Sequence, residues 1–176
     1  MRKILLSFLT LFCAFFTQAQ TNDAEKALAF HLVTANHDAI GLSAEDIGNS
    51  KVASTYYQAG NGIRMVYLQQ TFKGIPVYNQ LQVLSFRDNK LLSKAGERIT
   101  SIENVTYGKG GMPSVTANGA VLSALSDRKM NPMGSPIVIV TKDNGRFVEF
   151  DNMGISRSNI TAELMWVPGE KNQPIQ

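Results

Sequence analysis

The stretch from Gly62 to Glu97, GIRMVYLQQTFKGIPVYNQLQVLSFRDNKLLSKAGE, decides the fold of this chain. Its runs of Val, Ile, Tyr and Phe suit a pleated, half-buried surface. The pairs Lys73-Gly74 and Asp88-Asn89 between these runs accept the positive φ of two-residue hairpin loops. We therefore predict three consecutive strands in an antiparallel meander. Pro76 cannot donate to a ladder, so we place it at a strand start or on an edge.

Two pieces of this stretch occur together in a known pattern. The run Val66–Gln70 leads into Lys73–Tyr78, and Asp88–Leu91 follows at the second turn. This order resembles the fungalysin/thermolysin propeptide (FTP) domain, in which a strand ending in Gln-Gln leads into Gly-Ile-Pro-Val, an aromatic residue and a second hairpin. An unrelated three-stranded meander is the alternative.

The resemblance also implies which residues matter most. We predict a structural or docking motif that consists of Gln70, Gly74, Ile75, Pro76, Val77 and Tyr78. A purely structural role is the alternative to docking, because Gly74 supplies a positive φ and Pro76 defines the strand start.

Residues 1–20 have the composition of a secretory signal peptide. Arg2-Lys3 form a charged region, Ile4–Phe16 form a short apolar core, and Thr17-Gln18-Ala19 offers small residues for cleavage after Ala19. The apolar run is short for a membrane span, and an N-terminal anchor helix is the alternative. We expect a secreted, extracellular protein without membrane association after cleavage.

Composition and charge argue against a nucleic-acid partner and against disulfide bonds in the mature chain. The chain has 176 residues and a formal net charge of +3, and removal of the signal peptide would leave about +1. No basic patch suggests nucleic acid as a partner. The single cysteine, Cys13, lies in the signal peptide, so packing without disulfides must hold the mature chain together.

A helical pattern precedes the meander, from Asp23 to His37. Its predicted apolar stripe consists of Ala24, Ala27, Leu28, His31, Leu32 and Ala35. Asn22 or Asp23 is the predicted N-cap, and Asn36 with Gly41 marks the predicted exit.

Shorter signals connect this helix to the meander. Ser43 and Asp46 have the spacing of a capping box, and Lys51–Gln58 is expected as an additional strand. A helix that precedes a meander lays its stripe across one face of the sheet. We therefore predict an α+β fold, with a helix packed on an antiparallel β-meander in the cystatin/PepSY-like manner, over residues 21–106.

A glycine-rich linker at 107–113 is expected to lead to a second module of this kind at 114–176. Ser114 or Thr116 caps a predicted helix whose stripe consists of Ala117, Ala120, Val121, Ala124 and Leu125. Further strands are predicted at Ile137–Thr141, Arg146–Phe150 and Ile160–Val167.

The second module resembles the PepSY-like half of the same propeptides, which have an Ala-x-Leu-x-Trp-Val-Pro run where this chain has Ala162–Pro168. Ile160–Val167 is apolar enough for a sheet interior, yet few residues follow to build a partner strand. We therefore expect the module to be truncated at its C-terminus and the chain to be the N-terminal part of a longer polypeptide. A genuine end with a frayed tail is the alternative.

The residues themselves carry no recognisable catalytic motif. His31 and His37 are not arranged as His-Glu-x-x-His, and neither has a Gly-x-Ser-x-Gly companion. Glu45-Asp46 is better explained by helix capping than by catalysis. We expect no catalytic, cofactor-binding or metal site here, and leave open whether the whole precursor is an enzyme.

The resemblance implies a function that the residues do not. FTP-type propeptides precede a zinc metallopeptidase domain, inhibit it and assist its folding, so the expected partner is the chain's own peptidase domain beyond residue 176. Zinc is implied only for that domain. The alternatives are a free-standing secreted peptidase inhibitor and an extracellular binding module that would use Tyr56, Tyr57, Tyr67 and Tyr78.

Overall fold

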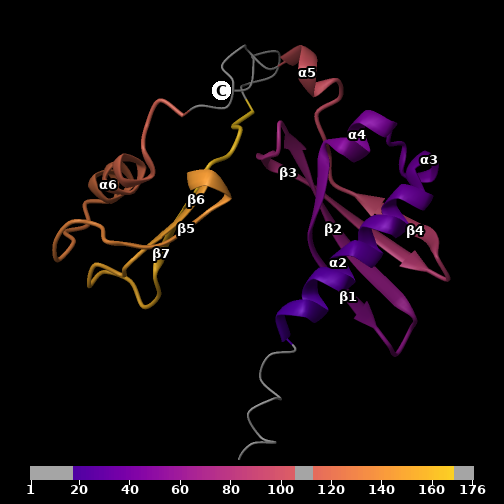
Figure 1. Cartoon of the computed structure of the whole chain (residues 1–176). Coiled ribbons are helices and arrows are strands. Elements are labelled where there is room, and N and C mark those ends of the chain that lie inside the picture. The colour runs from indigo at the N-terminus through magenta and orange to yellow at the C-terminus, as the bar shows by residue number, and fades with distance from the viewer. Residues whose placement is uncertain (1–17, 106–112, 169–176) are drawn as a thin grey trace, which may run out of the picture. The chain divides into compact units, whose positions relative to one another are not determined.

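The computed structural model describes residues 18–105 and 113–168 (Figure 1). The elements of its first part are α2 (Gln18–Ala35), α3 (His37–Ile40), α4 (Ala44–Gly48), β1 (Ser50–Gln58), β2 (Ile63–Phe72), β3 (Ile75–Arg87), β4 (Lys90–Ala95) and α5 (Ile102–Val105). Those of its second part are α6 (Ala117–Asp127), β5 (Val138–Lys142), the 3-10 turn η2 (Asp143–Gly145), β6 (Phe147–Phe150) and β7 (Ile160–Glu163). The fold is α+β, as the sequence predicts.

The chain divides into two compact units. The first contains the residues up to Gln70 and also Gln80–Ile99, and the second contains Thr71–Asn79 and the residues from Thr100 onward. The tip of the β2–β3 hairpin, residues 71–79, thus groups with a segment much later in the sequence. The limits 1–20, 21–106, 107–113 and 114–176 stay predictions, and most of the signal peptide and of the linker lies outside the described residues.

Strands β1 to β4 form an antiparallel meander in the order β1-β2-β3-β4. Both predicted turns are confirmed, with Lys73 and Gly74 at φ 49° and 72° and Asp88 and Asn89 at φ 50° and 61°. Positive φ at both central residues gives the turn a twist that matches the flanking strands. The turn chemistry therefore sets the strand order, and Pro76 follows directly on the start of β3 as predicted.

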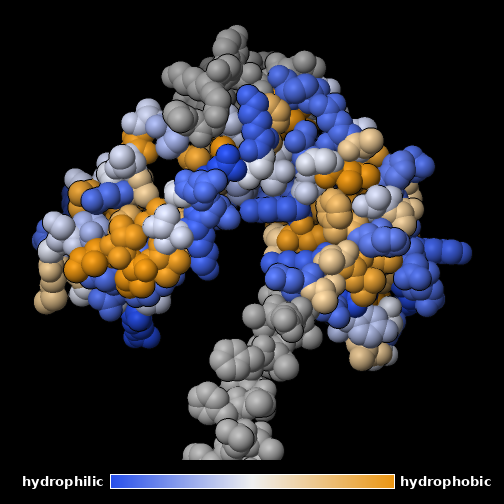
Figure 2. Space-filling view, in the orientation of Figure 1, coloured by the Kyte–Doolittle hydropathy of each residue, from blue (hydrophilic) through white to orange (hydrophobic). Residues whose placement is uncertain are grey.

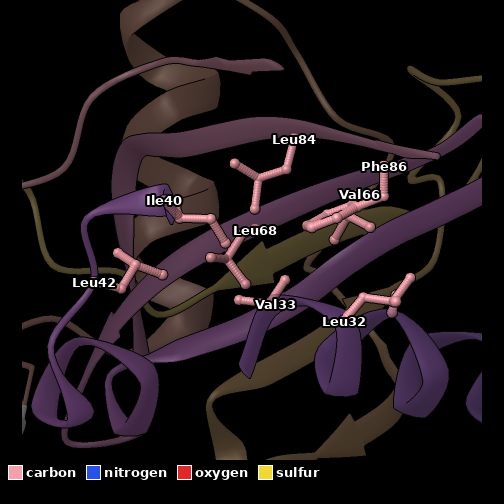
Figure 3. Packing of buried hydrophobic residues seen from close by; sticks show 9 residues of the cluster. Leu32, Val33, Ile40, Leu42, Val66, Leu68, Leu84 and Phe86 are labelled. Carbon is pink, nitrogen blue, oxygen red and sulfur yellow. The ribbon is translucent and has the colours of Figure 1, made fainter. Parts of the chain in front are cut away.

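Helix α2 packs across one face of this meander and builds the core of the first unit (Figure 3). Alternate residues of the two central strands, Val66 and Leu68 on β2 and Leu84 and Phe86 on β3, point toward it. The core is completed by residues of α2 and the following turn, namely Ala29, Leu32, Val33, Ile40 and Leu42. Period-two burial on the strands matches a sheet with one face against a helix.

The predicted apolar stripe of the first helix is wrong. The buried residues of α2 are Ala29, Leu32 and Val33, whereas Leu28 is 47% exposed and His31 is also exposed. Small alanines do not mark one side of a helix strongly, so the two stripes, which share Leu32, differ little in hydrophobicity. The predicted caps Asn22 and Asp23 are wrong as well, because both residues lie inside α2.

The capping box after α2 is confirmed. The Ser43 side chain accepts a hydrogen bond from the Asp46 amide at 3.1 Å, and the Asp46 carboxylate accepts one from the Ser43 amide at 3.0 Å. Gly41, with φ 82°, ends α3 in the left-handed conformation. These local signals depend on side chains only a few residues apart, which explains why they were recognisable.

The second unit contains α6 and a three-stranded antiparallel sheet in the order β5-β6-β7. Thr116 is the N-cap, and its hydroxyl accepts from the Gly119 amide at 3.1 Å. The core consists of Val121, Leu125, Val148, Phe150 and Met153. Of the predicted α6 stripe, Val121 and Leu125 are buried, whereas Ala120 and Ala124 are exposed.

The predicted strand Ile160–Val167 is too long. β7 ends at Glu163 and lies at an edge of the sheet, not in its interior. The chain beyond it leaves the ladder because the partner strand β6 is itself only four residues long, and Phe147 pairs with Glu163 at its start. In the described residues no helix is long and apolar enough to cross a membrane.

Candidate functional site at the tip of the β2–β3 hairpin

Strand β3 extends well past its partner β4 at the end nearest the hairpin tip. The last pair of the β3–β4 ladder is Val83 with Ala95, and the chain turns away at Gly96, with φ 86°. A Cβ at Gly96 would collide with the carbonyl oxygen of Leu81, so only glycine fits this close approach. The edge of β3 at residues 76–78 is therefore left to another partner.

Trp166 occupies this edge through its backbone. It forms a parallel bridge with Val77, in which the Trp166 amide donates to the Pro76 carbonyl and the Tyr78 amide donates to the Trp166 carbonyl, each at 2.8 Å. Pro76 has no N–H of its own, but its carbonyl is free to accept. All of these residues belong to the second compact unit.

The Trp166 side chain adds a second set of contacts. Its indole N–H donates to the Phe72 carbonyl at 2.9 Å, and the two aromatic rings lie 5.8 Å apart at an interplanar angle of 58°. The tilted arrangement is one that aromatic pairs prefer. Trp166 is 6% exposed and Val77 is fully buried. We refer to the backbone groups and side chains of Phe72, Pro76, Val77 and Tyr78 that contact Trp166 as the Trp166 site.

A second contact lies at the turn itself. The guanidinium of Arg146 is close to Gly74, where a Cβ would lie 3.3 Å from its Nη1 atom. The Arg146 carbonyl in turn accepts from the Leu164 amide at 2.7 Å, two residues before Trp166. Arg146 therefore links the turn at Gly74 to the segment that carries the tryptophan.

The structure divides the six predicted motif residues into two groups. Gln70, Ile75, Pro76 and Val77 are buried, whereas Gly74 and Tyr78 are exposed, Tyr78 to 51%. The four buried residues therefore contribute to packing. The exposed pair is the part of the motif that an outside partner would reach, and docking through it stays a prediction.

Gln70 connects the meander to the segment that follows β4. Its amide nitrogen donates to the Ile99 carbonyl at 2.8 Å, and its amide oxygen accepts from the Ile99 N–H at 2.9 Å. A side-chain amide that pairs with both groups of one backbone residue satisfies a buried polar segment in the manner of a strand. Gln70 is 2% exposed, so these bonds are shielded from water.

Arg98 holds the same segment from its other side. Its guanidinium lies 3.2 Å from the Asp46 carboxylate and also donates to the Asp46 carbonyl and the Ser50 hydroxyl. Burial lowers the pKa of Arg98, and the Asp46 charge partly opposes that shift. Arg98 therefore ties α4 to the sheet next to Gln70.

Neither histidine lies in a chemically active arrangement within the part of the chain that the structure describes. His31 is exposed on α2, and the His37 Nδ1 atom lies 3.1 Å from the Leu42 carbonyl. No three His, Cys, Asp or Glu side chains among residues 18–105 and 113–168 are close enough to hold a metal ion.

The pairing of Phe72 with Trp166, which are 94 residues apart, was not predicted from the sequence. One signal pointed toward it, since Trp166 is the single tryptophan of the chain and sits in an otherwise short apolar run. That signal identifies an anchor residue but not its partner.

Comparison with protein families identifies the segment that carries the site. Residues 49–97 match the Fungalysin/Thermolysin Propeptide Motif. The match begins next to β1 and ends just after β4, so it spans the whole meander and confirms the resemblance. Comparison with curated proteins and with solved structures gave no match.

The match covers residues 49–97 of the 176 and identifies a motif within the chain. The FTP motif is characteristic of propeptides of secreted peptidase precursors, and this chain carries that motif over its four-stranded sheet.

Proposed function

We propose that this chain is the propeptide region of a secreted zinc metallopeptidase precursor, and that it inhibits the attached catalytic domain and assists its folding. The observation that carries the proposal is the coincidence of the FTP match at residues 49–97 with one complete folding element, the meander and its turns. The predicted signal peptide supports secretion. The zinc ligands would belong to the peptidase domain.

Tethering explains how a small domain can inhibit its neighbour. A flexible covalent link gives an effective concentration of about 1 mM. A surface that binds the peptidase with a dissociation constant of about 10 μM would then occupy it about 99% of the time, and cutting the link would release it. Folding assistance requires only that the propeptide bind the native-like peptidase better than its unfolded chain.

The face of the meander opposite α2 is the surface that we assign to this contact. Tyr56 pairs with Met65 across β1 and β2, and both alternate with residues that face the helix. The rings of Tyr56 and Tyr67 lie 6.3 Å apart on the same face. Tyrosine and methionine are enriched at protein interfaces because they bury large area with few polar groups.

Inhibition in trans tests the proposal. The chain from Gln20 onward would be added to a fungalysin- or thermolysin-type metallopeptidase, and loss of peptide hydrolysis would be measured. We expect saturable inhibition that the double variant Tyr56→Ala/Tyr67→Ala weakens at least about tenfold. His31→Ala, which removes an exposed side chain on α2, is the matched control and should inhibit like the wild type.

Reading the coding DNA beyond codon 176 tests the same proposal independently. We expect an open frame that continues into a His-Glu-x-x-His helix with a downstream glutamate ligand. A stop codon there would leave a free-standing secreted inhibitor if inhibition in trans is nevertheless observed. A stop codon without inhibition would refute both versions.

One observation favours a second function, that of an extracellular binding module. Tyr57 and Tyr78 are more than half exposed, and neither belongs to the Tyr56–Tyr67 ring pair. Such a module would retain a surface ligand and would leave the peptidase active.

A further inference from the structure

The contact of Trp166 with β3 has the form of peptide recognition by strand addition. In that mode an extended segment pairs with an exposed strand edge, main-chain hydrogen bonds supply affinity, and a pocket for a side chain supplies specificity. Residues 76–78 supply the edge and bond to both backbone groups of one residue, Trp166. Phe72 supplies the contact to the side chain, through its carbonyl and its ring.

The contact with Phe72 is suited to tryptophan in particular. The Phe72 carbonyl accepts from the indole N–H, which phenylalanine and leucine lack, and the Phe72 ring packs against the indole. The neighbouring residue Val167 is 53% exposed, so the segment is not anchored there. Trp166 is the one buried side chain among residues 162–168.

The described segment from Leu164 to Pro168 lies beyond the last ladder pair of β7. β7 ends at Glu163, and the only bridge beyond it within residues 113–168 is the one between Trp166 and Val77. The Leu164 amide bonds to the Arg146 carbonyl, and Trp166 is held at the hairpin tip by its two backbone bonds and its indole bond. Opening of this contact would leave the β5–β6 and β6–β7 ladders intact.

We propose that the edge of β3 at residues 76–78, with Phe72, is a binding site for an extended peptide that carries a tryptophan. Trp166 is its resident ligand, and the site accepts the same peptide from outside when Trp166 is removed. The proposal concerns a recognition property of the hairpin tip and holds whether or not the chain inhibits a peptidase.

A peptide with the sequence of residues 162–168, Ala-Glu-Leu-Met-Trp-Val-Pro, is the probe. The receptor is the full chain with Trp166→Ala, which contains no tryptophan, so the emission of the peptide reports its binding directly. We expect a saturable shift of that emission to shorter wavelength. A fluorescein-labelled copy of the peptide should bind the wild-type chain at least about tenfold more weakly, because Trp166 already fills the site.

Two variants of the receptor distinguish the edge from a general apolar surface. Adding Tyr78→Pro removes the amide that donates to the tryptophan carbonyl and should weaken binding at least about tenfold. Adding Tyr57→Ala, which removes an exposed ring on β1 and leaves residues 76–78 as they are, should leave binding unchanged. A peptide with alanine in place of tryptophan should not bind.

Circular dichroism shows whether the receptor is folded. Should Trp166→Ala lose the folded signal, addition of the 162–168 peptide should restore it, whereas the peptide with alanine in place of tryptophan should not. Absence of saturable binding to a folded receptor would overturn the proposal. Failure of the peptide to restore folding, equal binding to the wild type, or equal effects of Tyr78→Pro and Tyr57→Ala would overturn it as well.

Discussion

Replacing Trp166 tests how much the contact at the hairpin tip contributes to stability. Trp166→Ala removes a nearly fully buried ring and leaves a cavity against Phe72 and Val77. Truncation of a buried tryptophan costs about 3–5 kcal/mol. Trp166→Phe keeps most of the ring contact and loses the hydrogen bond to the Phe72 carbonyl, which costs about 1 kcal/mol. We therefore expect a small loss in the free energy of unfolding for Trp166→Phe and a severalfold larger loss for Trp166→Ala.

Urea denaturation followed by far-ultraviolet circular dichroism measures both losses. Val167→Ala is the matched control, since it truncates a neighbouring apolar residue that is half exposed, and we expect a change within about 0.5 kcal/mol. The reasoning fails if Trp166→Ala costs less than about 1 kcal/mol, or if the control costs as much. Equal losses for phenylalanine and alanine would show that the hydrogen bond, not burial, carries the energy.

Three further substitutions test other parts of the structure by the same denaturation assay. Gly74→Ala should destabilise the chain by about 1 kcal/mol, because φ is 72° there; no change would mean that the turn relaxes. Gln70→Ala should cost about 1–3 kcal/mol, because it leaves the buried N–H and carbonyl of Ile99 without their partner, and a neutral result would argue against the paired bonds. Leu32→Ala should cost about 2–5 kcal/mol, whereas Leu28→Ala on the exposed side of α2 should cost about 0.5 kcal/mol or less; the reverse order would restore the helix face that the sequence favours.

The meander was predictable because its signals are local. The φ values of Lys73-Gly74 and Asp88-Asn89 follow from residue type, and each turn brings together strands that are adjacent in the sequence. The same holds for the Ser43–Asp46 capping box and the Thr116 cap. Each depends on residues at most a few positions apart.

The buried face of α2 was not predictable in the same way. The helix offers two overlapping stripes, and the choice between them depends on the shape of the sheet that it meets. Val33 fits against the residues of β2 and β3 in the core, while Leu28 stays exposed. The space-filling view shows apolar side chains also at the surface, which is common in folded proteins, so hydrophobicity alone does not identify the core (Figure 2).

Residue type and spacing were enough to establish the α+β class, the order of strands in the meander and the resemblance to FTP propeptides, because hairpin turns and helix caps act over a few residues. The Trp166 site depended on folding in three dimensions. Its edge exists because β4 stops pairing at Ala95, and its ligand comes from 94 residues away from Phe72. A contact of that kind has no local signature, since the edge and the tryptophan become partners only when packing brings them together.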